Sequence, residues 1–211
     1  METYLLALSS LIVVIGPWKA AIVFAERTSG LPLATRRMVA VATFAMSLVI
    51  ALIFVLLGAP IIDFFHIGEA AFLIAAGLLV LVFAIRMVIS EEQHEPEPDG
   101  DAQVDDRTPW RLAAYPLSVP MLVTPPAFAA LVALSVFVDA EGNALLPVVA
   151  AVVTVLVFDL VVFLGEAQWE RLVPMEVWSV AGRVLGVLLA GFAMAIILEG
   201  LQLAEIVPKP H

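Results

Sequence analysis

The sequence predicts an all-α polytopic membrane protein in which six transmembrane helices form two inverted three-helix repeats, with helices 1 and 4 broken. Three observations predict this fold: the composition, six apolar stretches, and a matching pair of helix breakers. Of the 211 residues, 63% are hydrophobic and 14% are charged, whereas a soluble domain is usually close to half apolar and a quarter charged. With a mean hydropathy of +1.07, most of the chain is expected to lie in lipid.

Each of the six apolar stretches is long enough to cross roughly 30 Å of hydrocarbon as a helix. None shows the alternation of polar and apolar residues that marks a half-buried strand. The first stretch is not expected to be a cleaved secretion signal, because its leading segment carries Glu2 and no basic residue. The predicted spans are Tyr4–Ala25, Met38–Gly58, Glu69–Ile89, Ala113–Val138, Leu145–Gly165 and Val180–Leu203.

Basic residues predict the orientation of these spans. They gather in or beside the connections that follow spans one, three and five, and the opposite side holds only Lys209. By the positive-inside rule these three connections are cytoplasmic, which places both termini outside. The basic residues in question are Arg27, Arg36, Arg37, Arg86, Arg107, Arg111, Arg171 and Arg183.

The connection Ser90–Trp110 is predicted to be a flexible cytoplasmic linker. It carries eight acidic residues among prolines and one glycine, a composition that cannot bury a core. His94 among these acids offers weak metal binding as an alternative, but a solvated tether is favoured. The predicted units are therefore a first three-helix repeat (1–89), the acidic linker (90–112) and a second, inverted repeat (113–211).

An internal repeat relates the two halves. Residues Ile15–Ala21 align with Val123–Ala129, and Ala75–Val80 align with Val184–Leu189 at nearly the same offset. Because each half holds three spans, the second half must run upside down relative to the first. Inverted repeats with interrupted helices are typical of secondary transporters, whose substrate sites lie near the midplane where the repeats meet.

Residues that interrupt a helix stand at matching depth in two spans. They are Gly16 and Pro17 in span one, and Thr124, Pro125 and Pro126 in span four. A proline removes one N–H group and disfavours helix in the preceding residue, so each span can end one half-helix and begin another. The second half-helices would start mid-membrane with free N–H groups that favour an anionic ligand. The alternative is a pair of simple proline kinks. With Lys19, the breakers form the predicted substrate-binding set: Gly16, Pro17, Lys19, Thr124, Pro125 and Pro126.

Two ionisable residues lie deep within spans. Lys19 follows the first break, Asp159 sits inside span five, and each lies roughly 20 Å from the outer face by helical rise. Such residues are functional candidates because an unpaired charge in lipid is costly. Lys19 can bind an anionic group or extend to the cytoplasmic face. Asp159 can carry a coupling cation or a proton, or form a structural ion pair or hydrogen bond.

Hydroxyl side chains inside the spans predict no site. Ser9, Ser10, Thr43 and Ser47 are expected to bond the carbonyl groups of their own helices, as such residues commonly do.

Several motifs together point to a known family. They are Gly16–Lys19, Phe64–Ile67, Ile74–Leu79, Pro116–Pro120 ahead of Thr124–Pro126, and Gly200 at the end of span six. The Pro116–Pro120 run is the most specific of them. This combination resembles the MarC family of six-span bacterial inner-membrane proteins, which is grouped with LysE-type exporters. The resemblance covers nearly the whole chain outside the acidic linker and implies a transporter of small solutes in the bacterial cell membrane.

The sequence therefore predicts a small-solute exporter that works by alternating access at a midplane site, for a solute with an anionic group. Its expected partners are the lipid bilayer and an unknown small-molecule substrate. The net charge of −10 argues against nucleic-acid binding. The spacing of Gly182 and Gly186 suits close helix packing within or between subunits, which leaves a homo-oligomer open.

The alternative function is a non-transporting membrane interaction or assembly protein, in which the breaks and glycines serve packing alone. An enzyme is not expected, because His66, His94 and His211 lie outside the spans, the chain has no cysteine, and the usual hydrolase motifs are missing. No catalytic residue, metal ligand or cofactor is predicted.

Overall fold

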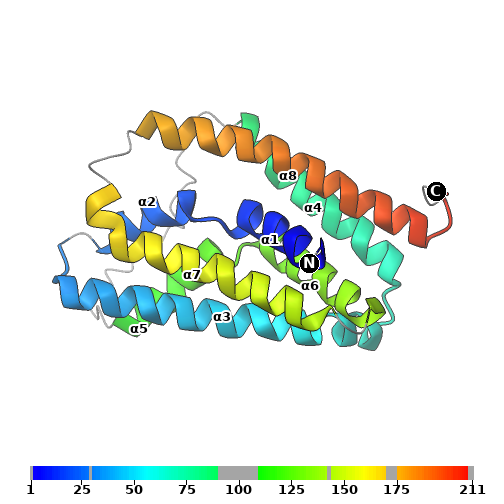
Figure 1. Cartoon of the computed structure of the whole chain (residues 1–211), viewed down its shortest axis with the longest axis horizontal. Helices are drawn as coiled ribbons and strands as arrows, with labels where there is room; N and C mark the ends of the chain where they lie inside the picture. Colours follow the sequence, from blue (N-terminus) through cyan, green and yellow to red (C-terminus); the bar gives the residue numbers. More distant parts are fainter. Residues whose placement is uncertain (1, 29, 90–108, 142–143, 170–174, 209–211) are drawn as a thin grey trace.

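In the computed structural model, the chain is an elongated bundle of helices (Figure 1). The structure describes residues 2–28, 30–89, 109–141, 144–169 and 175–208, and all the regular structure in these ranges is helical. In chain order the elements are α1 (Glu2–Ile15), α2 (Pro17–Thr28), α3 (Leu33–Phe64), α4 (Glu69–Ile89), α5 (Pro109–Leu112), the π-helical segment η1 (Ala113–Leu122), α6 (Pro125–Glu141), α7 (Leu145–Trp169) and α8 (Met175–Leu203).

Four helices in the described part of the chain are long and apolar enough to cross a membrane: α3, α4, the Leu145–Gly165 part of α7 and the Arg183–Leu203 part of α8. The chain is therefore an all-helical, multi-pass membrane protein. The predicted first and fourth spans appear as shorter apolar helices, Thr3–Ile15 and Pro125–Val136. Most of the predicted linker lies outside the described residues, and helical structure resumes at Pro109.

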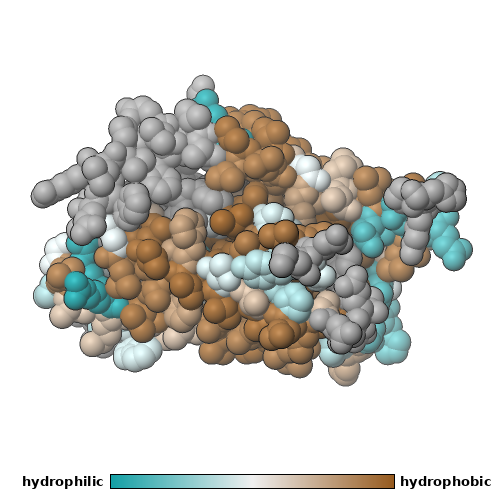
Figure 2. Space-filling view, viewed as in Figure 1, coloured by the Kyte–Doolittle hydropathy of each residue, from teal (hydrophilic) through white to brown (hydrophobic). Residues whose placement is uncertain are grey.

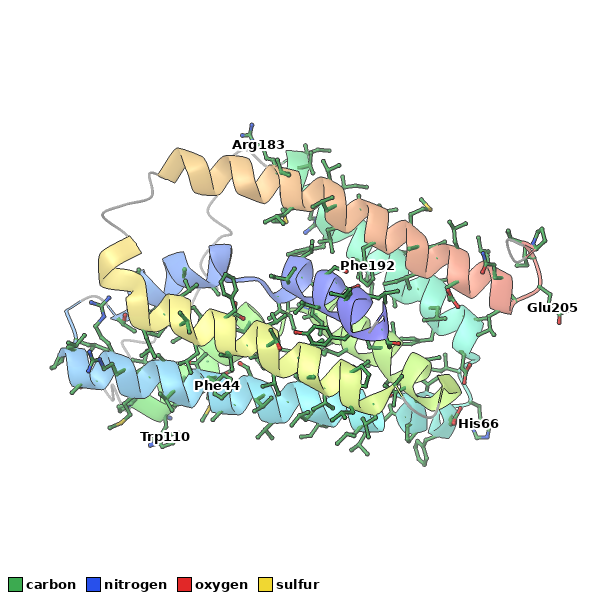
Figure 3. All side chains as sticks on the ribbon, viewed as in Figure 1. Phe44, His66, Trp110, Arg183, Phe192 and Glu205 are labelled. Carbon is green, nitrogen blue, oxygen red and sulfur yellow. The ribbon has the colours of Figure 1, made fainter. Side chains whose placement is uncertain are left out.

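The surface matches this assignment. Less than half of each candidate span is buried, between 28% and 39% of its most apolar window, so large side chains such as Val49, Leu79 and Val187 face outward. Hydrophobic residues cover much of the middle of the visible face, and hydrophilic ones lie mostly toward the two ends (Figure 2). Trp110 lies toward one end of the bundle and His66 and Glu205 lie at the other, whereas Arg183 lies on the flank nearer the middle (Figure 3).

The interrupted segments surround a central helix pair. Helices α3 and α7 contact each other; α7 also contacts α1 and α2, whereas α3 also contacts η1 and α6. The interrupted segments in turn meet, α1 with α6 and α2 with η1. Two rings of four elements result, α1–α7–α3–α6 and α2–α7–α3–η1, and the breaks in the chain lie where one ring passes into the other.

Helices α4 and α8 lie side by side along one flank (Figure 1). A Cβ atom on Gly77 would lie 2.6 Å from Ile197 Cγ1 and 2.9 Å from Ala193 O, and one on Gly200 would lie 2.9 Å from Ala70 O. No real side chain fits at such distances. Glycine is therefore required for the close approach of these helices, as is common in membranes.

A second close contact joins α3 to α6. A Cβ atom on Gly58 would lie 2.9 Å from Ser135 Cβ, and the Ala59 N–H donates a hydrogen bond to Ser135 Oγ at 2.8 Å. The rings of Phe54 and Phe128 pack beside this contact, with centroids 4.5 Å apart. Buried serine thus joins two membrane helices by a hydrogen bond in an apolar setting.

Candidate functional site

The first break is a single residue. Gly16 is the only non-helical residue between α1 and α2, and it is buried. Its N–H donates to Ile12 O at 3.1 Å, but Pro17 has no N–H with which to continue the ladder. Because Gly16 carries no side chain, it cannot cap the first turn of α2. The side chains of Pro17 and Lys19 lie outside the part of the chain that the structure describes.

The second break is longer than predicted. Within η1, Tyr115 (φ −141°, ψ 128°) and Val119 (φ −131°, ψ 127°) are extended rather than helical. Each directly precedes a proline, Pro116 or Pro120, and the ring of a proline excludes helix in the residue before it. The fourth span therefore begins to unwind about two turns before Thr124. The sequence predicted the break at Thr124 itself.

Helix α6 begins with an N-cap. The Ala127 N–H donates to Thr124 Oγ1 at 3.2 Å, and the Phe128 N–H donates to Thr124 O at 2.9 Å. Pro125 and Pro126 have no N–H group to offer. Every backbone donor in the first turn of α6 is thus absent or used, which corrects the expectation of free N–H groups at this end. Of the two breaks, the one before α2 has no side chain that could cap the helix in this way, because Gly16 precedes it.

Asp159 is buried in α7 at the level of the first break. Its exposed fraction is 1%. On one side of it along α7, the Thr154 hydroxyl lies 3.2 Å from the Tyr4 hydroxyl near the start of α1. On the other side, Phe163 stacks on Phe24 of α2, with ring centroids 4.6 Å apart and planes at 5°. Because these contacts bracket both Asp159 and the α1–α2 break, this residue of α7 lies at the level of the break.

The carboxyl group of Asp159 has no hydrogen-bond partner for either oxygen among the residues that the structure describes. An unpartnered buried polar group is rare in native proteins and requires an explanation such as a bound ion or water. An ionisable side chain at membrane depth is by default a functional candidate. Among the residues that the structure describes, none prevents Asp159 from receiving a proton, a cation or a group of a ligand.

Two more buried groups share this property, and they were not predicted. Thr43 and Ser47 of α3 are fully buried, and their hydroxyl oxygens have no hydrogen-bond partner in the described chain. The prediction that they bond the carbonyl groups of their own helix was wrong. It holds for Ser9 and Ser10, which both donate to Leu6 O at 3.0 and 2.6 Å.

The unpartnered groups therefore lie on the two central helices. Thr43 and Ser47 belong to α3 and Asp159 to α7, which are members of both rings. In the described residues, no three His, Cys, Asp or Glu side chains gather as a transition-metal site would require. The chemistry that the arrangement offers is reversible binding by a carboxyl group, hydroxyl groups and the start of α2.

Comparison with known proteins identifies relatives along the whole chain. Residues 1–204 match the model of a family described as MarC family integral membrane protein. The chain is 27% identical over 205 residues to UPF0056 membrane protein MJ1677 of Methanocaldococcus jannaschii, covering 96% of this chain and 97% of that protein. It is 26% identical over 197 residues to UPF0056 membrane protein YvbG of Bacillus subtilis, covering 92% and 91%. No solved structure matches.

Proposed function

Since this chain belongs to the MarC family of integral membrane proteins, we propose that it transports small solutes across the membrane by alternating access. In this proposal the six crossings form two inverted three-helix repeats, and a solute with an anionic group binds at the midplane between them. The direction proposed is export. Both termini lie outside the cytoplasm of a bacterial cell, as the basic connections indicate.

Paired contacts at a constant spacing are the observation that carries the inverted repeat. A Cβ on Gly77 would meet Ile197 at 2.6 Å, and a Cβ on Gly186 would meet Val88 at 2.8 Å. Gly186 follows Gly77 by 109 positions, and Ile197 follows Val88 by the same 109. Each contact is therefore the other one with the two halves of the chain exchanged, as a two-fold relation between the halves requires.

Aromatic contacts repeat the exchange between elements but not between residues, because the partner Phe128 follows Phe24 by 104 positions. Phe163 of α7 follows Phe54 of α3 by 109 positions. Phe54 packs on Phe128 of α6, and Phe163 packs on Phe24 of α2. In both halves the phenylalanine of a central helix thus meets a ring from the second part of an interrupted span.

The breaks obey nearly the same spacing, because Thr124 follows Gly16 by 108 positions. Two interruptions related in this way, each next to the central helices, provide what a midplane site between repeats needs. A pair of isolated proline kinks explains neither the constant spacing nor the unwinding of η1 over several residues.

The proposed role of each helix start follows from whether its backbone N–H groups have a capping side chain. Gly16, Pro17 and Lys19 form the wall that holds the anionic group, because the start of α2 has no capping side chain and adds the positive end of a helix dipole. The opposite wall is the start of α6, with Thr124, Pro125 and Pro126. Its donors are used internally, so it shapes the site and does not bind the anion through N–H groups.

Ligand-dependent stability of the purified protein tests this proposal. Small anions, amino acids and sugar derivatives are screened against the parent protein, Lys19→Met and the matched control Lys209→Met, which removes the only other lysine of the chain. A bound solute at 100 times its Kd is expected to stabilise the parent and the control by about 2.7 kcal/mol. Lys19→Met is expected to lose this effect, because it lacks the charge that holds the anion.

A compound that stabilises all three proteins equally would remove Lys19 from the recognition site. If no compound stabilises the parent, the proposal loses its substrate site, and a membrane interaction or assembly protein becomes the better reading.

A further inference from the structure

We propose that Thr43, Ser47 and Ser118 form a binding site for a monovalent alkali cation between α3 and η1. The site lies in the ring α2–α7–α3–η1, on residues of α3 and η1, whereas the solute is proposed to bind at the start of α2. Cation binding at this site requires no solute and no transport, so it can fail or succeed independently of the proposed function.

Oxygen atoms converge around the Ser118 hydroxyl group. Ser118 Oγ lies 2.7 Å from Ala113 O and 3.3 Å from Thr43 O. One hydroxyl hydrogen can be donated well to only one of these carbonyl oxygens. Ser118 itself is 1% exposed, so bulk water does not complete the arrangement. The buried oxygen atoms of Ser118, Ala113 and Thr43 can therefore accept more hydrogen bonds than the Ser118 hydroxyl group donates.

Two further hydroxyl groups, those of Thr43 and Ser47, stand on the part of α3 whose Thr43 carbonyl oxygen lies 3.3 Å from Ser118 Oγ. The two residues stand four positions apart, so their side chains lie on the same face of the helix, one turn from each other. Both are fully buried, and neither hydroxyl has a hydrogen-bond partner among the described residues. Leaving buried hydroxyl groups unpartnered is costly in the absence of a ligand. A bound ion relieves this cost by using their oxygens as ligands.

The unwound segment η1 brings a backbone oxygen to this group. Tyr115 and Val119 of η1 are extended, and the Ala113 carbonyl oxygen at its start lies 2.7 Å from Ser118 Oγ. Unwound backbone carbonyl groups beside a continuous helix are the ligands that coordinate Na⁺ in membrane transporters.

The type of oxygen indicates the charge of the ion. All the ligands proposed are neutral hydroxyl or carbonyl oxygens, which suit a single positive charge. Protein sites for Ca²⁺ and Mg²⁺ rely on carboxylates, and neither Ser118 nor Thr43 has a carboxylate among the hydrogen-bond partners that define this contact. Na⁺ and K⁺ share this ligand chemistry, and the test below distinguishes them.

Thermal unfolding of the full chain in detergent, in NaCl, KCl or choline chloride at equal ionic strength, tests the site. For the parent protein we expect the Tm to rise saturably with Na⁺ or K⁺ above its value in choline chloride, and the larger rise identifies the ion. In Thr43→Val and Ser47→Ala the apparent affinity for the cation should fall at least about tenfold, because a ligand oxygen is lost. Ser10→Ala removes a buried hydroxyl that bonds its own helix and should keep the parent response.

Tm values in choline chloride show whether each variant is folded. Thr43→Val keeps the side-chain shape and removes an unpartnered hydroxyl, so its Tm in choline chloride should equal or exceed that of the parent; if it does not fold, Ser47→Ala decides. The proposal is overturned if the parent has the same Tm in all three salts, which would mean that the hydroxyl groups hold water alone. It is also overturned if both variants keep the full cation response.

Discussion

Asp159→Asn is expected to abolish solute transport in proteoliposomes while leaving the protein as stable as the parent or more stable. The carboxyl group is 1% exposed and has no hydrogen-bond partner in the described chain. Asparagine keeps the shape of the side chain and carries no charge into a buried place without a partner, so no loss of stability is expected. The same change removes the group that is proposed to carry a proton or cation as the site changes sides.

The matched control is Asp63→Asn, which makes the same change at an exposed position near the end of α3 and should alter neither property. Flux is measured with the solute that the ligand screen identifies, and stability by thermal unfolding. Transport at the parent rate by Asp159→Asn would show that the carboxyl group is structural. A clear loss of stability would show that it has a partner that the described side chains do not include.

The second large effect is expected for Gly77→Val, which should lower the free energy of unfolding by about 3 kcal/mol or more. Overpacking a close contact forces backbone shifts, and here even a Cβ atom would lie 2.9 Å from the carbonyl oxygen of Ala193. Gly191→Val in α8 is the matched control, because a Cβ at that position meets nothing within 4 Å. Thermal unfolding and the yield of monodisperse protein measure the difference.

Gly186→Val extends this experiment to the other half of the chain. Its contact with Val88 is the exchanged counterpart of the contact between Gly77 and Ile197, so an inverted repeat predicts a loss of similar size. Equal effects of the substitutions at Gly77 and Gly191 would contradict close packing of α4 on α8. A loss at Gly77 with none at Gly186 would contradict the exchange.

Hydropathy alone predicted most of the helical fold. Helix α4 begins at Glu69, where the sequence predicted it, and is helical as far as Ile89, because the polar Glu69 is followed by a long apolar run. Helix α3, Leu33–Phe64, is longer at both ends than the predicted span Met38–Gly58. A helix can continue beyond the hydrocarbon into polar surroundings, where hydropathy no longer indicates it.

The site was predicted in part. Depth along α7 was enough to single out Asp159, whereas Thr43 and Ser47 were missed because the direction of a hydroxyl group depends on its rotamer and on neighbouring helices. The unwinding of η1 could have been predicted from the sequence, since Tyr115 and Val119 each precede a proline. The cap of α6 could also have been predicted, because a threonine followed by proline is a typical helix start.

Alternating access is tested most directly by the accessibility of two single cysteines in this cysteine-free chain. Ser10→Cys and Ser118→Cys each lie six residues before a break, at Gly16 or Thr124, and both serines are buried. In an inverted repeat they lie on opposite sides of the midplane. Labelling rates with a membrane-impermeant thiol reagent are measured from each side of the membrane, with and without ligand.

Alternating access predicts that Ser10→Cys is labelled only from outside and Ser118→Cys only from inside, and that any condition that speeds one reaction slows the other. Rates that rise and fall together would contradict this mechanism. So would cysteines that remain unreactive under every condition, because the breaks would then be kinks in a scaffold that opens to neither side.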